Sequence, residues 1–175
     1  ISYAHPLDGG RAGIAWRDIE RTAAGLGVDE RAWLSLLRPL STHVEGVVDF
    51  TGNQMLRVPR EPITALRFAL RMLDQGTPLA RRSFRTEEAA ALMAGVLAHA
   101  NTPLPSLAGA AAGLLLAAQA HAGGWMYPRG GAQRIADSMV ADIEAHGGSV
   151  ESGIHVTDLG SLDWGDPARG DLLML

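Results

Sequence analysis

The residues best suited to chemistry in this sequence lie between Trp125 and Arg134, where aromatic and arginine side chains surround the pair Gly130-Gly131. Glycines have no Cβ atom, so this pair lets the backbone approach a ligand closely or take a positive φ. The helix predicted directly afterwards offers unpaired N–H groups and the positive end of its dipole to such a ligand. The simpler interpretation is a tight turn that caps the helix.

The side chains of this loop leave two interpretations open. Trp125 and Tyr127 either pack at a domain edge or form an aromatic wall for a planar cofactor or an apolar substrate, stiffened by Pro128. Arg129 and Arg134 either face solvent or supply charge beside that ligand.

Beyond the loop, the pattern predicts a helix, a glycine turn and a strand. Ile135, Met139 and Ile143 follow one another at intervals of four residues and form an apolar stripe on this helix. Gly147-Gly148 predicts its end. The β-branched, partly alternating residues over 149–159 predict the strand.

Other chemical motifs are missing from the sequence. The six histidines show no metal-ligand spacing such as HExxH. His99, near the end of an apolar helix, and His121, just before the loop, are each either partly buried or dipole-stabilised, or polar contacts in a substrate cavity. No GxSxG motif or Ser-His-Asp order appears, and the carboxylates are scattered over solvated faces. We therefore predict no acid–base pair and no metal site.

The stretch GGWMYPRGGAQRIADSMVADIEAHGGSVESGIHV resembles the segment that closes the substrate domain of phytoene desaturase-like FAD-dependent oxidoreductases, a branch of the amine-oxidase-like flavoproteins. Their pattern is Gly, aromatic, Pro, x, Gly-Gly, a helix, Gly-Gly, and a strand that ends in Val. The positions that fall on it are Tyr127, Pro128, Gly130, Gly131, Ile135, Gly147, Gly148 and Val156. The rest of the chain is similar to that family's helical substrate domain with lower specificity.

The resemblance implies FAD as the cofactor, a small apolar substrate, and an FAD-binding domain of the same parent chain as partner. It also implies that the loop lies beside the isoalloxazine in positioning roles, which fall on Gly130, Gly131, Gln133 and Arg134. Trp125, Tyr127 and His99 are the predicted substrate contacts. Hydride chemistry would belong to the flavin, so the lack of a protein base does not argue against this class.

The composition limits the classes of function. The 175 residues are 47% apolar and only 19% charged, so some apolar surface is expected to meet a partner, a missing domain or a greasy ligand. A net charge of −4 with no basic run argues against nucleic acid. The absence of cysteine fits an intracellular protein, and the apolar run over 107–118 is too short to cross a bilayer. We expect a cytoplasmic protein and leave association with a membrane surface open.

The first third of the chain predicts a hairpin over 2–16 that turns at Asp8-Gly9-Gly10, followed by three helices. The first begins near Trp16 and ends at Gly25 and Gly27. Asp29 is the expected N-cap of the second, which Pro39 should break or kink. The third covers 43–55, with Thr42 and Glu45 at capping-box spacing.

The middle of the chain predicts three more helices, separated by a short one near Leu79. Pro62 begins the first, in which Ile63, Leu66, Leu70 and Leu73 share one face. Thr86 begins a helix whose core face is Leu92, Met93, Val96 and Leu97. The last, over 105–122, is apolar nearly all round, so we expect it to be buried in the domain centre or to line an apolar cavity with helix 86–100. Gly109 and Gly113 would let another helix approach it closely.

These elements predict an α+β fold, mostly helical, with a small sheet built from the 2–16 hairpin and the 149–159 strand. We expect a substrate-binding domain over 1–160 and a return segment over 161–175 toward a missing dinucleotide-binding domain, because the ends look cut and GxGxxG is absent. The expected function is that of an FAD-dependent oxidoreductase, inactive as this chain alone. The alternatives are a non-catalytic helical module that binds lipid or protein and, more weakly, a self-contained hydrolase.

Overall fold

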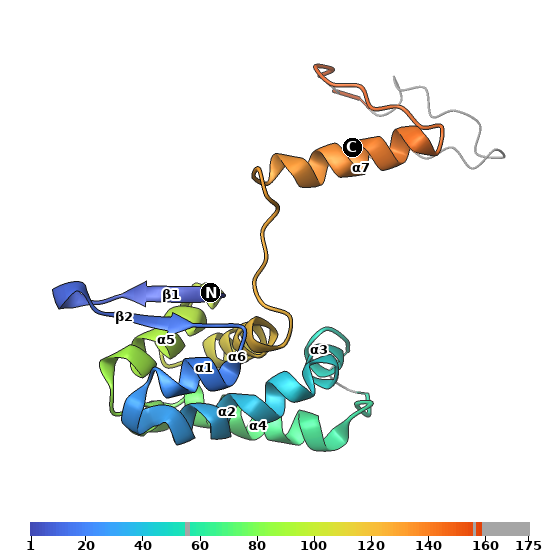
Figure 1. Cartoon of the computed structure of the whole chain (residues 1–175). Coiled ribbons are helices and arrows are strands. Elements are labelled where there is room, and N and C mark those ends of the chain that lie inside the picture. Colours follow the sequence, from blue (N-terminus) through green and yellow to red (C-terminus); the bar gives the residue numbers. More distant parts are fainter. Residues whose placement is uncertain (55–56, 156, 159–175) are drawn as a thin grey trace. The chain divides into compact units, whose positions relative to one another are not determined.

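The computed structural model describes residues 1–54, 57–155 and 157–158, and within them the chain is mostly helical with one small sheet (Figure 1). The predicted α+β class is confirmed. The chain forms two compact units, Ile1–Met126 and Tyr127–Leu175, where the sequence predicted one domain over 1–160. The predicted return segment 161–175 lies outside the described residues.

The predicted hairpin is confirmed. Strands β1 (Tyr3–Pro6) and β2 (Ala12–Ala15) pair antiparallel, with Tyr3 opposite Ala15. The short 3-10 turn η1 (Asp8–Gly10) joins them, and its Gly9 and Gly10 have φ values of 73° and 75° that favour glycine.

The predicted strand over 149–159 is wrong for the residues that the structure describes there. Residues 149–155 and 157–158 form no strand, and all of them are exposed. β-Branched residues favour a strand only when a neighbouring strand completes the ladder of hydrogen bonds and a face is buried. The small sheet therefore consists of β1 and β2 alone within the described chain, while Val156 lies outside it.

The first unit is a helical domain organised around its last helix. That helix, α6 (Leu107–Ala122), packs against α2, α3, α4 and α5, which confirms the predicted central position. The helices of this unit are α1 (Ile19–Ala24), η2 (Gly27–Asp29), α2 (Glu30–Thr42), α3 (Val44–Thr51), α4 (Pro62–Gln75), η3 (Pro78–Arg82), α5 (Glu87–Leu97), η4 (Ala98–Ala100) and α6. Helices α2 and α4 lie side by side, and both contact α6 (Figure 1). The largest buried side chains are Trp33, Phe68, Leu37, Leu40, Leu92 and Leu114.

The close approach predicted at the glycines of α6 is confirmed. A Cβ atom at Gly113 would lie 2.7 Å from the Cα of Leu97, and one at Gly109 would lie 3.3 Å from the Leu97 carbonyl oxygen. Helices α5 and α6 are therefore closely packed at this crossing. At this crossing the two backbones leave no room for a cavity, and the predicted apolar cavity of the helices at 86–100 and 105–122 stays a prediction.

Two predicted helix caps are wrong. Asp29 makes no side-chain cap for α2, and its carboxylate instead accepts hydrogen bonds at the start of α5. Thr42 is the last residue of α2 rather than the start of a capping box, and α3 ends at Thr51, before Gly52. Asp18, at the start of α1, does cap its own helix, accepting from the N–H groups of Glu20 and Arg21.

Helix α2 continues through Pro39 instead of breaking there. Proline has no N–H, so the carbonyl of Ser35, four residues earlier, lacks its usual helical donor. Arg71 of α4 supplies one: its Nη2 donates to the Ser35 oxygen and its Nε to the Leu36 oxygen, each at 2.8 Å. A tertiary contact thus completes the ladder that the proline interrupts.

Helix α4 points its aliphatic stripe outward. Its inner face carries Phe68, which is 1% exposed and packs edge-on against Phe50 at 6.0 Å. Thr64, Ala65 and Gln75 are buried beside it, although they are smaller or more polar than the residues left outside. The exposed stripe consists of Ile63, Leu66, Leu70 and Leu73.

The second unit contains α7 (Gln133–Ala145), as predicted. The helix follows Gly130-Gly131 and ends before Gly147, whose φ of 85° confirms the glycine stop. The predicted apolar stripe is present but faces solvent in part, with Ile135 at 54% and Met139 at 60% exposure.

Candidate functional site

Two of the predicted substrate contacts come together in the first unit. The rings of Trp125 and His99 meet edge to face at 5.7 Å. Trp125 is half-buried and its Nε1 donates to the carbonyl oxygen of Leu116, at 3.2 Å, which fixes the indole against α6. His99 is exposed, with Nδ1 3.2 Å from the carbonyl oxygen of Gly95.

Sequence reasoning missed Tyr3, which forms the other side of this aromatic cluster. The Tyr3 ring lies 4.9 Å from that of Trp125 and 6.1 Å from that of His5. Burial raises the pKa of the Tyr3 phenol well above its usual value, and its hydroxyl has no hydrogen-bond partner among the described residues. The two-residue spacing of Tyr3 and His5 on β1 was the signal available, since such residues share one face of a strand.

An open groove of about 700 Å³ adjoins Trp125. It lies between α3 and the C-terminal end of α6, and it continues along the backbone of Gly123 and Gly124. Val44 and Val48 of α3 give it an apolar side, and Gln119 gives it an amide. Trp125 thus borders a hollow able to take a small molecule, whereas His99 does not line it.

The charged part of the groove is an ion-pair cluster around Asp49 of α3. Arg57 Nη2 lies 2.7 Å from the Asp49 carboxylate, and Arg60 contributes its backbone N–H at 3.2 Å and its Nε at 3.6 Å. The hydrogen bond from Arg57 holds the pKa of Asp49 below its usual range despite the opposing effect of burial. Asp49 is therefore a permanent carboxylate, suited to holding the 57–60 segment rather than to transferring protons.

The predicted cofactor loop lies in the second unit and has the backbone that its glycines suggested. Gly130 and Gly131 have φ values of 94° and 93°, and the N–H of Gly131 donates to the Pro128 carbonyl oxygen at 3.1 Å. A Cβ atom at Gly131 would meet nothing within 4 Å, so the positive φ, and not crowding, requires glycine. Tyr127 at 88% exposure stands free beside it.

Gln133 and Arg134 begin α7 and both turn toward one carboxylate of their own helix. Gln133 Nε2 donates to Asp137 at 3.1 Å, and Arg134 Nη1 lies 3.8 Å from the same carboxylate group. The Arg134 side chain is 66% exposed. An exposed pair of this length contributes little, so the guanidinium can exchange Asp137 for an anionic ligand at small cost.

His121 belongs to the core rather than to the site. Trp33 Nε1 donates to its Nε2 at 3.1 Å, so that nitrogen is the acceptor and the proton sits on Nδ1, which donates to the Trp16 carbonyl oxygen at 2.8 Å. Burial lowers the pKa of His121, and its hydrogen bonds oppose the shift only in part. Of the two interpretations left open, the structure favours a neutral, buried histidine.

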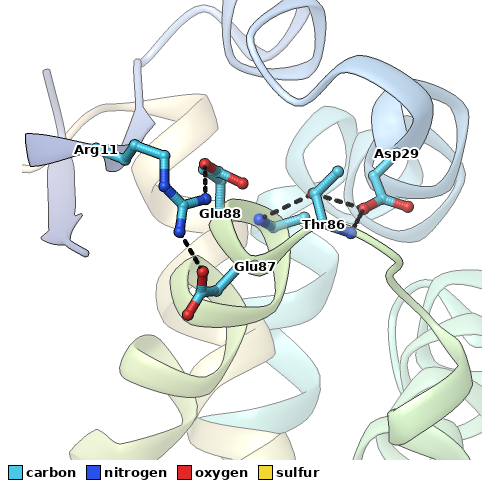
Figure 2. A network of polar contacts seen from close by, with 6 residues as sticks. Arg11, Asp29, Thr86, Glu87 and Glu88 are labelled. Atoms are coloured by element: carbon cyan, nitrogen blue, oxygen red, sulfur yellow. Dashed lines mark hydrogen bonds and ion pairs between the residues drawn. The ribbon is translucent and has the colours of Figure 1, made fainter. Parts of the chain in front are cut away.

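A network of polar contacts surrounds the beginning of α5, as Figure 2 shows. Asp29, only 2% exposed, accepts the N–H and hydroxyl of Thr86, both at 2.6 Å, and the N–H of Arg85. Burial by itself raises the pKa of Asp29, but these hydrogen bonds outweigh it and hold the pKa below its usual range. Arg11 pairs with Glu87 and Glu88 at the surface nearby. The network therefore links the start of α5 to Asp29 of η2 and to Arg11, the residue before β2.

Comparison with protein-family models, with curated proteins and with solved structures finds no match. Among the described residues, no cluster of three or more histidine, aspartate or glutamate side chains is arranged to hold a metal ion. No helix in the same part of the chain is both long and apolar enough to cross a membrane. The groove of the first unit has an aromatic wall, aliphatic contacts and an amide, and the loop of the second unit has an exposed guanidinium. Groups of these kinds are common in ligand sites.

The loop and the first turn of α7 combine an open backbone with exposed polar side chains. The loop backbone is open on the outer side at Gly131, because an added Cβ would find no neighbour there. Exposed Arg134 and Gln133 supply a cation and an amide at the first turn of α7, where the helix dipole also favours an anion. Within the described chain, α7 has no buried residue that could act as a nucleophile next to them.

Proposed function

We propose that the chain is the substrate-binding domain of an FAD-dependent oxidoreductase that acts on a small apolar substrate. The observation that carries the proposal is the Gly130-Gly131 turn, with both residues at positive φ directly before α7. Glycine is needed at both positions for a backbone reason, and both fall on the glycine pair of the resembled flavoprotein segment. Gly147 at φ 85° supports the same alignment at the other end of the helix.

In this proposal the chain's residues bind and orient, and bound FAD supplies the hydride chemistry. Gly130 and Gly131 let the cofactor approach the backbone, while Gln133 and Arg134 contact its polar atoms. Trp125 and the apolar side of the groove hold the substrate framework. Tyr127, whose ring is exposed, is the aromatic side chain that the second unit would offer to the ligand.

The domain would work with an FAD-binding domain of the same parent chain, in the cytoplasm. A second candidate is a non-catalytic module that binds lipid or protein. The exposed stripe of α4 favours it, since four aliphatic side chains on one face are more than scattered surface residues explain.

The absorption spectrum of the protein expressed from its complete gene tests the proposal. We expect visible flavin bands at a near-stoichiometric ratio to protein. Arg134→Ala should lower flavin content or turnover, because it removes the cation at the start of α7. Arg129→Ala is the matched control, since it removes an exposed arginine from the same loop and should change neither.

Two outcomes would contradict the assignment. A colourless protein that stays colourless with added FAD would favour the binding module and return the glycine pair to a simple capping turn. If flavin content and turnover are unchanged in Arg134→Ala, the loop is not part of the cofactor site. The proposal that the protein is a flavoprotein would then still stand.

A further inference from the structure

We propose that α4 and η3 form a surface that lies in the interface of an anionic lipid bilayer. The apolar part is the stripe of Ile63, Leu66, Leu70 and Leu73, exposed by 67, 61, 57 and 49%. Their spacing of three, four and three residues places all four on one side of the helix. The inference does not rest on flavin binding or on the resemblance.

The inner face of α4 shows that this stripe is not a core face turned the wrong way. Phe68 is 1% exposed and contacts Phe50, and Arg71 bonds two carbonyl groups of α2. These contacts fix the rotation of the helix about its axis. The stripe is thus held on the outer surface of the first unit by a packed interface on the other side of α4.

Charge selects the partner. Residues 57–85 hold seven of the fifteen basic residues of the chain, all arginine, against the two acidic residues Glu61 and Asp74, in a protein of net charge −4. Arg67 borders the stripe, and Arg81 and Arg82 follow in η3, which contacts α4. All three are exposed, and their guanidinium groups form no ion pair within the described chain.

The surface matches the two layers of a bilayer interface: the aliphatic stripe suits the hydrocarbon layer, and the unpaired arginines that border it suit the phosphate groups of the lipid heads. Asp74 is the one acidic residue of α4, and its carboxylate accepts a hydrogen bond from the side-chain amide of Gln75. Arginine heads reach the headgroup layer while their stems lie along the leucines. A surface attachment of this kind needs no helix that crosses the membrane.

Flotation of the full 175-residue chain with lipid vesicles tests the inference. We expect binding to mixed phosphatidylcholine–phosphatidylglycerol vesicles, weaker binding at high salt, and little binding to phosphatidylcholine alone. Arg81→Ala/Arg82→Ala should lower the partition coefficient about 25-fold, because each arginine near an anionic surface contributes about 5-fold. Leu66→Ser/Leu70→Ser should lower it about 10-fold or more, because binding strength scales with the apolar area inserted.

Ile135→Ser/Met139→Ser is the matched control. It removes two aliphatic side chains of similar exposure from α7 and should leave vesicle binding unchanged. Circular dichroism confirms that each variant is folded, as expected for exposed positions. A folded wild-type chain that ignores anionic vesicles overturns the inference. Equal loss of vesicle binding in the α4 and α7 variants also overturns it. A third such outcome is a chain that does not bind vesicles but sediments as a dimer, which Leu66→Ser/Leu70→Ser dissociates.

Discussion

Replacing Arg71 by methionine should destabilise the first unit by removing the donors that complete helix α2 around Pro39. Methionine keeps much of the apolar stem and loses the guanidinium. The carbonyl of Ser35 then has no helical donor, because residue 39 is proline, and the Leu36 carbonyl loses its second donor.

The two hydrogen bonds set the magnitude. A hydrogen bond from a charged donor contributes about 1.5–3 kcal/mol net, but the Ser35 bond lies at the exposed edge and counts for less. We expect a loss of about 2–3 kcal/mol in the free energy of unfolding. In a Pro39→Ala background the N–H of residue 39 again reaches Ser35, so the same change should cost about 1 kcal/mol less.

Urea unfolding of the four chains of this cycle measures the coupling. Fluorescence is a suitable probe, because buried Trp33 lies in α2 itself. Linear extrapolation gives each free energy of unfolding. Arg67→Met is the control, since it removes an exposed guanidinium from the same helix without breaking a bond made by that group.

The reasoning is refuted if Arg71→Met costs no more than Arg67→Met. It is also refuted if the cost of Arg71→Met is the same with proline and with alanine at position 39. Equal costs would mean that Arg71 stabilises by packing alone and that the helix tolerates Pro39 without outside help.

Four further changes test other parts of the structure. Gly113→Ala should cost about 1–3 kcal/mol in urea unfolding, because its Cβ would press on the backbone of α5, whereas Gly123→Ala, with no neighbour closer than 3.9 Å, should cost less. Asp29→Asn should lower the free energy of unfolding by about 2–3 kcal/mol in the same assay. Its NH₂ group would replace an oxygen that now accepts hydrogen bonds from the N–H and hydroxyl of Thr86. Tyr3→Phe should be neutral or raise the melting temperature, and a marked loss would reveal a partner for the hydroxyl. Burial lowers the pKa of His121 in the folded state, so below pH about 6.5 the unfolded chain binds more protons than the folded chain. The stability that neutral His121 contributes is therefore complete above this pH and decreases as the pH falls toward the folded-state pKa. The urea midpoint should therefore drop less between pH 7 and 5 in His121→Gln than in the wild type. An equal drop in the two chains would contradict this.

Local features of the sequence predicted local structure well. The Asp8-Gly9-Gly10 hairpin, the start of α5 at Thr86 and the glycine stop at Gly147 each depend on backbone preferences within a few residues. The all-round apolar character of α6 also predicted its central place, because such a helix has no face to give to water. The Gly130-Gly131 turn before α7 belongs to the same group.

Features that depend on distant residues were decided only by the tertiary structure. Asp29 was expected to cap its own helix, but burial beside Thr86 gives it stronger donors than its neighbours in sequence offer. The strand expected over 149–159 had the right residues and no partner within the described chain. In the candidate site, the sequence marked Trp125 and His99 but not Tyr3, whose ring contacts that of Trp125 although the two are more than one hundred residues apart.

The sequence by itself therefore determined where most helices and turns begin and end, since these follow from hydrogen bonds and φ preferences inside short segments. The tertiary structure decided which face each helix buries. The aliphatic stripe of α4 is the plainest case: its periodicity was visible, but Phe68 and Arg71 on the other side had partners in α3 and α2 and turned the leucines outward. Burial depends on the sum of contacts around a helix, and a one-dimensional pattern contains only the contributions of the helix itself.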